Sequence, residues 1–201
     1  RLFLDALLKG SYPAEALTMF GSLFPESSTE DMKRIAAPLD WVGVNYYSRS
    51  VVWNDPNALL IQATQVQPPD SEYSQMWEIY PQGIYDLLTR IQRDYPPTHI
   101  YVTENGICVP DGVDFDGRVR DVRRIAYLRD HLVQVHRAIQ DGVPVRGYFV
   151  WSLLDNFEWA YGYKMRFGLV YVDYDTLTRT VKDSGRWYSR VIEENGFIAS
   201  S

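Results

Sequence analysis

The 201-residue sequence contains a single cysteine, Cys108, so no intrachain disulfide can form. A chain without disulfides is typical of a reducing compartment, and we therefore expect a cytoplasmic location. Long apolar runs are also missing: none approaches the roughly 18 residues that a membrane-spanning helix needs. No basic-apolar signal opens the chain at Arg1. These absences argue against a membrane protein.

Positive charge is scarce as well, with 20 Lys and Arg residues against 26 Asp and Glu residues and a formal net charge of -6. This balance argues against nucleic acid as a partner, because phosphate binding needs clustered Lys and Arg. Uncharged substrates are compatible with it.

Metal-binding patterns are incomplete. Asp114–Gly117 resembles part of a calcium loop, but Gly112 and Arg123 occupy the positions of its first ligand and its bidentate Glu. Asp173–Asp175 lacks the glycine of such a loop. His131 and His136 do not share a helix face, and we interpret both as helix-surface residues. We expect neither a metal nor a cofactor.

The composition, 46% hydrophobic and 14% aromatic, is enough for a sizeable core, and we expect one α/β domain over residues 1–201. Apolar periodicity and capping residues predict helices, whereas β-branched and aromatic runs predict strands. The predicted helices are Arg1–Lys9 ending at Gly10, one opened by Pro13, Ser28–Ala37, one opened by Pro81, a long one with the stripe Ile125, Leu128, Leu132, Val135 and Ile139, and Ser184–Glu194 closed by Gly196. The predicted strands are Trp41–Tyr46, Ile100–Thr103, Arg146–Trp151, and a hairpin of Leu169–Val172 with Arg179–Val181.

Strands that alternate with helices in this way indicate parallel βαβ units. The remaining segments are irregular. We interpret Asn54–Asp70 as a long excursion with an irregular hairpin at Leu59–Ala63, and Cys108–Gly117 as a polar loop.

A carboxylate stands at the end of one predicted strand. His99–Val102 is a short apolar run that follows two prolines and stops at Asn105-Gly106, so Glu104 lies where the strand leaves the sheet. In a parallel α/β barrel this is the catalytic end, although a strand-end Glu can also be an ordinary salt-bridge partner. Asn45 and Tyr47 close the preceding strand on a common face and can converge on one ligand.

A second strand ends in aromatic and polar residues, in the run Trp151-Ser152-Leu153-Leu154-Asp155-Asn156-Phe157-Glu158-Trp159. Indole faces cover the apolar face of a pyranose, and a carboxylate accepts hydrogen bonds from its hydroxyls, so Trp151, Glu158 and Trp159 suit an uncharged sugar. A buried aromatic cluster is the alternative for the two tryptophans. Asp155 and Asn156 between them are not typical core residues.

With this run and Thr103-Glu104-Asn105-Gly106, the sequence resembles glycoside hydrolase family 1 over nearly its whole length. The resemblance implies a β-glucosidase-like retaining enzyme with Glu104 as the nucleophile and Tyr47 as its hydrogen-bond donor. It further implies substrate contacts from Asn45, Trp77, Trp151, Glu158, Trp159 and Phe167. The contacts at Trp77 and Phe167 are the weaker parts of the match, and packing is the alternative for Phe167. Unphosphorylated β-glucosides or β-galactosides are the expected substrates.

The family's acid/base Glu, in a Thr-x-Asn-Glu-Pro motif, has no counterpart here, because no Asn-Glu-Pro occurs in the sequence. We therefore expect the carboxyl-terminal part of a TIM (β/α)8 barrel, roughly strands six to eight with their helices, since a whole barrel needs about 250 residues. Such a segment needs an amino-terminal half as partner, or self-association, and is expected to be inactive alone. An inactive half-barrel scaffold and a carbohydrate-binding fragment remain alternatives.

Overall fold

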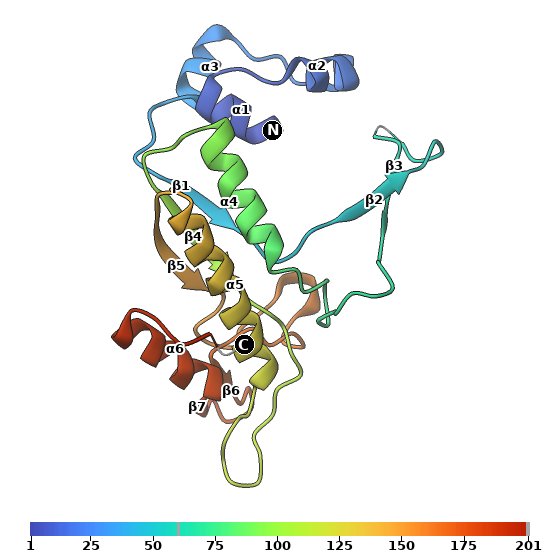
Figure 1. Ribbon diagram of the computed structural model, residues 1–201. Coiled ribbons are helices and arrows are strands. Elements are labelled where there is room, and N and C mark those ends of the chain that lie inside the picture. Colours follow the sequence, from blue (N-terminus) through green and yellow to red (C-terminus); the bar gives the residue numbers. More distant parts are fainter. Residues whose placement is uncertain (60, 200–201) are drawn as a thin grey trace.

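The computed structural model describes residues 1–59 and 61–199 (Figure 1). Its elements in chain order are α1 (Leu2–Lys9), α2 (Ala14–Phe20), η1 (Gly21–Leu23), α3 (Thr29–Ile35), β1 (Val42–Asn45), β2 (Val51–Asn54), β3 (Ala63–Val66), α4 (Gln82–Asp94), β4 (Ile100–Asn105), α5 (Val122–Gln140), β5 (Val145–Val150), η2 (Trp159–Tyr161), β6 (Val170–Val172), β7 (Arg179–Val181) and α6 (Asp183–Glu194). Among the described residues, no helix is both long and apolar enough to cross a membrane.

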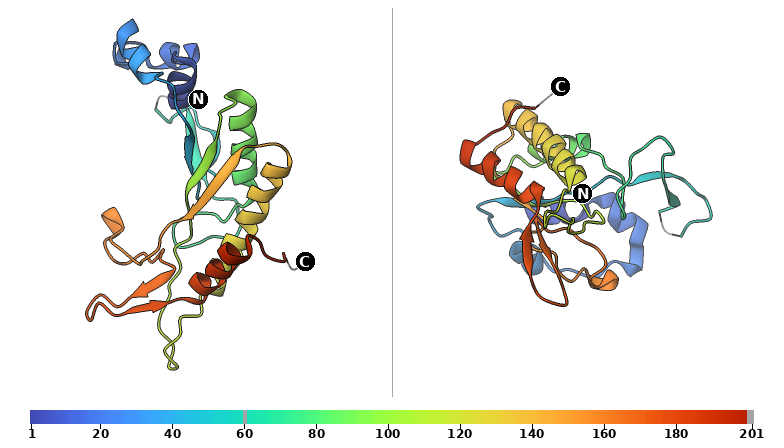
Figure 2. Two further views of the ribbon diagram at one scale, coloured as in Figure 1. Left: turned by 90° about the vertical axis from the view of Figure 1, so that its left-hand side faces the viewer. Right: turned by 90° about the horizontal axis from the view of Figure 1, so that it is seen from below.

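The central sheet has the strand order β1-β4-β5, and both neighbouring pairs are parallel. α4 lies in the connection from β1 to β4, and α5 connects β4 to β5, so the predicted βαβ units are confirmed. Both helices pack on the same face of the sheet (Figures 1 and 2). The hydrophobic core lies between the sheet and these two helices. It is made of Val42, Val44, Tyr46, Ile84, Leu88, Ile91, Ile100, Val102, Val135, Ala138 and Val143.

The helix boundaries follow their capping residues. α1 is capped at its carboxyl end by Gly10, which has the left-handed φ of 69° that glycine tolerates. α3 is capped at its amino end by Ser28, whose side chain accepts a hydrogen bond from the Asp31 amide in a reciprocal capping box. α4 follows Pro81, as predicted. α6 ends at Glu194, as predicted, but its carboxyl-terminal cap is Asn195 in the left-handed region, one residue before the predicted Gly196.

The other face of the sheet is open. Trp41 is 50% exposed and Phe149 is 57% exposed. With Tyr101 and Thr103 they line a shallow hollow on this face. Tyr101 and Thr103 alternate along β4 with the buried Ile100 and Val102, so one strand serves a covered face and an open one. The open face therefore carries large apolar side chains in contact with solvent.

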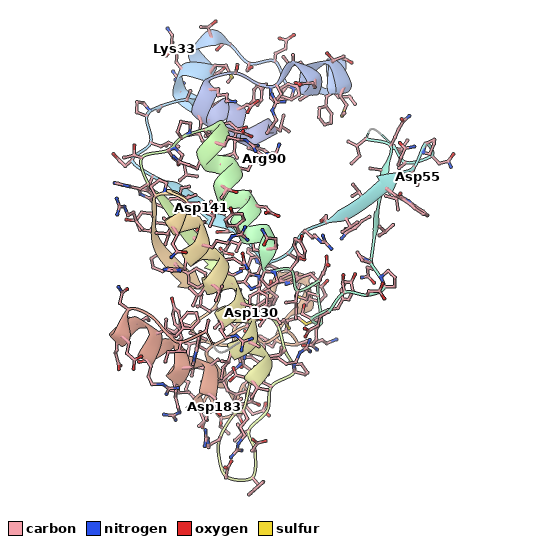
Figure 3. The ribbon with its side chains drawn as sticks, in the orientation of Figure 1. Lys33, Asp55, Arg90, Asp130, Asp141 and Asp183 are labelled. Atoms are coloured by element: carbon pink, nitrogen blue, oxygen red, sulfur yellow. The ribbon has the colours of Figure 1, made fainter. Side chains whose placement is uncertain are left out.

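The predicted irregular hairpin at Leu59–Ala63 is wrong in its position. An antiparallel hairpin is present, but it pairs β2 with β3 and projects away from the body (Figure 1). Leu59, Ile61 and Gln62 lie in the connection between these two strands, and Leu60 lies outside the described residues. The turn is organised by Asp55 (labelled in Figure 3), which accepts hydrogen bonds from Thr64 Oγ1 and the Asn57 amide.

The buried face of α5 differs from the predicted stripe. Its buried residues are Arg124, Tyr127, Leu128, His131, Val135 and Ala138. Ile139, predicted as apolar stripe, is 44% exposed. His131 was predicted on the surface and is fully buried, because its ring stacks on Tyr127 with the centroids 3.8 Å apart. His136 is exposed, as predicted.

The connection after β4 is not polar throughout. It begins with fully buried Ile107 and Cys108, and the Cys108 thiol lies 3.2 Å from Gln75 Oε1. The loop becomes exposed further on, where Asp114 and Asp116 both form ion pairs with Arg120. The carboxyl-terminal hairpin of β6 with β7 agrees with the prediction.

Candidate active site

The carboxyl ends of β1 and β4 bring Tyr47 and Glu104 together. β1 pairs with β4 so that Asn45 lies opposite Glu104, and Tyr47 follows two residues later. The Tyr47 hydroxyl donates a 2.6 Å hydrogen bond to Glu104 Oε2. Burial, reinforced by the hydrogen bond to this carboxylate, raises the pKa of Tyr47 far above its ordinary value. Tyr47 therefore keeps its proton and remains a donor to Glu104.

Aromatic side chains surround this pair. The Tyr47 ring lies 5.0 Å from the Trp77 ring and 6.3 Å from the Phe167 ring, measured between centroids. Trp77 and Phe167 are 5.8 Å apart, so the three rings form one cluster. The sequence-predicted residues Tyr47, Trp77, Glu104 and Phe167 thus come together from four separate segments. Phe167 is 2% exposed, so its ring is packed inside this cluster.

Asn45 lies at the same edge, where its Oδ1 accepts a 2.6 Å hydrogen bond from Thr103 Oγ1. Its side chain is exposed at the end of β1. Thr103 lines the hollow of the open face together with Tyr101 of the same strand, and Asn45 is exposed beside Thr103. Asn45 and Thr103 thus form a polar pair at the end of an apolar face.

A buried hydrogen-bond network lies behind Glu104. Asn105 is fully buried; its Nδ2 donates to the Tyr46 carbonyl (2.7 Å) and to the Tyr127 hydroxyl (3.0 Å). The Tyr127 hydroxyl in turn donates to the Tyr47 carbonyl over 2.9 Å, and Tyr148 donates to Asn105 Oδ1. This network ties the end of β4 to β1, α5 and β5. It fixes the backbones that carry Tyr47 and Glu104.

The third strand places Trp151 beside this network. The Trp151 amide donates to the Asn105 carbonyl over 2.9 Å, and the peptide bond from Trp151 to Ser152 is cis. At Gly106 an added Cβ would lie 1.9 Å from the Trp151 carbonyl oxygen, so only glycine fits between these backbones. The last residue of the Thr-Glu-Asn-Gly motif thus permits the close approach of β4 and β5.

Glu158 and Trp159 lie further along the loop after β5. The negative charge of Glu158 contributes to the raised pKa of Tyr47. Trp159 is 81% exposed. The structure therefore places the Trp151 backbone beside the end of β4 and leaves Trp159 on the solvent side of the loop after β5.

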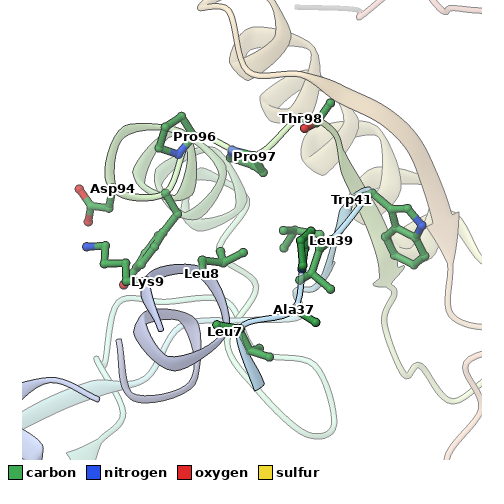
Figure 4. A pocket seen from close by; sticks show the side chains of 14 residues that line it. Leu7, Leu8, Lys9, Ala37, Leu39, Trp41, Asp94, Pro96, Pro97 and Thr98 are labelled. Atoms are coloured by element: carbon green, nitrogen blue, oxygen red, sulfur yellow. The ribbon is translucent and has the colours of Figure 1, made fainter. Parts of the chain in front are cut away.

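A different hollow of about 480 Å³ lies at the opposite end of the sheet (Figure 4). It is bounded by α1, by the segment before β1 and by the Pro96-Pro97 turn before β4. Its lining is mainly apolar, with Lys9 and Asp94 as its charged members. Because it lies at the amino ends of the strands, it is separate from Glu104.

Sequence reasoning missed the residues that support the site. Tyr127 and Arg124 are on the buried face of α5, and their spacing with Leu128 and Val135 follows the helical period. That spacing was a usable signal. The contacts of Asn105 come from residues far apart in the chain, and the sequence holds no signal for them.

The parallel α/β sheet thus carries a tyrosine-bonded carboxylate and aromatic rings at its carboxyl edge, which is the edge where α/β barrels place their functional residues. Comparison with known proteins agrees. The family model described as "Glycosyl hydrolase family 1" matches residues 1–197. Beta-glucosidase A of Thermotoga maritima is 49% identical over 195 residues, covering 97% of this chain and 44% of that protein.

Solved structures give the same result. The family 1 β-glucosidase of Thermotoga maritima superposes with a TM-score of 0.94 at 49% identity, covering 98% of this chain and 44% of that one. The β-glucosidase of the same organism in complex with deoxynojirimycin gives a TM-score of 0.93 at 49% identity and the same coverage. The chain belongs to glycosyl hydrolase family 1. It matches part of the family's barrel and spans less than half the length of these relatives.

Proposed function

We propose that this chain supplies the nucleophile and part of the sugar-binding site of a retaining β-glucosidase. The observation that carries the proposal is the 2.6 Å hydrogen bond from Tyr47 to Glu104 at the carboxyl end of the sheet. It orients one carboxylate oxygen and leaves the other available to a substrate. The aromatic surroundings and the membership in the family support the same assignment.

In the proposed reaction Glu104 attacks the anomeric carbon of a β-glycoside. The new bond from Glu104 to this carbon forms as the bond to the leaving oxygen breaks, which gives a covalent glycosyl-enzyme. The leaving oxygen takes a proton from a second carboxylic acid, and that group then activates the water that releases the sugar. Its carboxyl is required about 5 to 5.5 Å from Glu104.

The substrate contacts are proposed for the residues around this carboxylate. Trp151 forms the stacking platform, Glu158 accepts from the 4- and 6-hydroxyls, and Trp159 donates to the 3-hydroxyl. Asn45 adds a polar contact at the end of β1, Trp77 faces the aglycone, and Phe167 lines the sugar pocket. A carboxylate at the 6-hydroxyl repels a phosphate there, so unphosphorylated β-glucosides or β-galactosides are the substrates.

The acid/base is proposed to come from residues outside these 201, because no Asn-Glu-Pro is present. In this proposal β1, β4 and β5 are barrel strands six, seven and eight, and residues 1–201 form one carboxyl-terminal unit. The open face with Trp41 and Phe149 supports a partner that covers it. That partner is an amino-terminal barrel half or, without one, a second copy of this chain.

A fluorosugar with an activated leaving group tests the nucleophile. We expect 2-deoxy-2-fluoro-β-glucoside to label Glu104 in the assembly of this chain with an amino-terminal half, and Glu104→Gln to abolish both labelling and turnover. Glu72→Gln is the matched control, since Glu72 is an exposed carboxylate paired with Arg123. Peptide mapping that places the label on another residue would overturn the assignment.

Native mass spectrometry with an activity assay tests the partner. We expect the isolated 201-residue chain to be inactive on β-glucosides and to associate, either with itself or with an added amino-terminal half that bears Asn-Glu-Pro. A compact and active monomer of this chain alone would contradict the proposal.

A further inference from the structure

A cluster of buried charges lies outside the residues proposed to touch the sugar. It joins three carboxylates to three cations through ion pairs of 2.5 to 2.9 Å. Its members are Asp111, Asp121, Arg124, Asp155, Arg166 and Lys182. They come from the loop after β4, from α5, from the loop between β5 and β6 (residues 151–169, the sugar loop), and from the junction of β7 with α6. Five of the six side chains are 5% exposed or less, and Arg166 is 16% exposed.

Asp155 ties the two ends of the sugar loop together. Its Oδ1 accepts from Lys182 Nζ (2.9 Å) and from the Gly168 amide (2.9 Å). Its Oδ2 accepts from Arg166 Nη1 over 2.7 Å. Gly168 is pressed against this corner, because an added Cβ would lie 2.2 Å from the Asp155 nitrogen. The carboxylate thus closes the loop that carries Glu158 and Trp159.

Phe167 is held between two of these contacts. On one side Arg124 Nη2 donates to the Arg166 carbonyl over 2.8 Å, and on the other the Gly168 amide binds Asp155. The Phe167 carbonyl also accepts from the Ser152 amide (3.2 Å). The cluster therefore fixes the backbone of a residue whose ring contacts the Tyr47 and Trp77 rings.

Lys182 is the member that connects the two loops. Its Nζ lies 2.6 Å from Asp111 Oδ2, in the loop after β4, and 2.9 Å from Asp155 Oδ1, in the sugar loop. Its side chain is fully buried, and burial lowers its pKa from the ordinary value. A lysine is rarely buried to this extent unless it forms an ion pair. Removing one partner of a buried ion pair destabilises a protein more than replacing both partners with apolar residues.

We propose that Lys182 is a positioning residue that holds the sugar loop against the loop after β4, and thereby sets where Glu158 and Phe167 meet the substrate. This inference rests on the proposed function for the roles of Glu158 and Phe167. The link from Lys182 to the loop itself rests on the contacts of Asp155 and Asp111. Local order and sugar selectivity are therefore tested separately.

Hydrogen exchange on the 201-residue chain tests local order. In Lys182→Met we expect amides of residues 151–169 to exchange about tenfold faster than in the parent, while those of β1 and β4 keep their rates. Arg118→Met is the matched control: it removes one cation from an exposed pair with Asp183 (labelled in Figure 3) in the same region. Its exchange in the sugar loop should stay at the parent level.

Arg166→Lys is the second variant, to be used if Lys182→Met does not fold. It keeps the positive charge at a partly exposed position but alters the contacts of the Asp155 carboxylate. It should loosen the same segment. Uniform acceleration across the chain, or none in residues 151–169, would overturn the proposal, because Lys182 would then contribute only general stability.

Selectivity tests the positioning in the active assembly. The ratio of kcat/KM for a β-glucoside to that for the β-xyloside, which lacks the hydroxymethyl group, does not depend on how much enzyme is folded. We expect Lys182→Met to lower this ratio by about tenfold, since a group displaced by about 1 Å can cost up to ~10²-fold. Arg118→Met should leave it unchanged.

Glu158→Gln calibrates this assay. If it lowers the ratio while Lys182→Met does not, the positioning role is wrong. If Glu158→Gln itself leaves the ratio unchanged, the proposed role of Glu158 fails, and the exchange experiment alone decides the role of Lys182.

Discussion

We expect the stability of the fold between pH 7 and pH 5 to depend strongly on His131. The ring is fully buried on α5, and its Nδ1 lies 2.7 Å from the Tyr127 carbonyl, which accepts a hydrogen bond from the neutral ring. Nε2 is buried and has no hydrogen-bond partner among the described residues. Burial therefore disfavours the imidazolium and lowers the pKa of His131 from 6.5 to about 4.

The direction of the pH effect follows from proton uptake. As the pH falls below about 6.5 the unfolded chain binds a proton at this histidine, whereas the folded chain stays neutral until about pH 4. The unfolded state binds more protons throughout this window, so the free energy of unfolding falls with falling pH. Integration from pH 7 to pH 5 gives a loss of about 2 kcal/mol from His131 alone.

Urea unfolding of the parent and of His131→Phe at both pH values isolates this contribution. Phenylalanine keeps an aromatic ring for stacking on Tyr127 and has no titratable group. We expect the parent to lose about 2 kcal/mol more than the variant between pH 7 and pH 5, because all other groups titrate in both proteins.

His136→Gln is the matched control, since His136 lies on the same helix with its side chain exposed. Its loss of stability between the two pH values should equal that of the parent. If His131→Phe shows the same pH dependence as the parent, the buried neutral histidine is not the cause and the reasoning is refuted.

Three further substitutions test the support of the site. Tyr127→Phe removes a buried hydroxyl that makes two hydrogen bonds, and we expect the free energy of unfolding in urea to fall by about 1 to 3 kcal/mol. Tyr85→Phe is the control: it removes an exposed hydrogen bond and should cost under ~0.5 kcal/mol. Gly106→Ala should cost about 3 kcal/mol or more by the same measurement, because its Cβ meets the Trp151 carbonyl; a loss under ~1 kcal/mol would contradict the close approach. Tyr47→Phe should lower kcat/KM of the active assembly by about 10- to 100-fold, the worth of a hydrogen bond to a charged group, and an unchanged value would remove Tyr47 from the mechanism.

The sequence predicted the central βαβ units because their signals are local. Ile84, Leu88 and Ile91 follow the helical period, and all three are buried in α4. The strand ending at Glu104 stands between a proline pair and Asn105-Gly106, and the structure confirms β4 there. Glu104 and Tyr47 meet because parallel strands bring their carboxyl ends to one edge.

Polar residues in the interior were harder to predict. His131 occupies a buried position of α5, but a polar side chain weakens the apolar pattern on which the prediction rested. Lys182 is buried only because Asp111 and Asp155, far away in the chain, supply its counter-charges. Burial of this kind depends on tertiary contacts, and no local sequence pattern predicts it.

Two independent networks stabilise the two sides of the candidate site. The neutral one, through Asn105 and Tyr127, fixes the strand ends that carry Tyr47 and Glu104, whereas the charged one, through Asp155 and Lys182, closes the sugar loop. All their contacts arise within the described part of this chain. Since a side chain held by packing and hydrogen bonds needs little reorganisation when a ligand arrives, we expect the Tyr47 and Glu104 pair to be held in place by contacts within this chain.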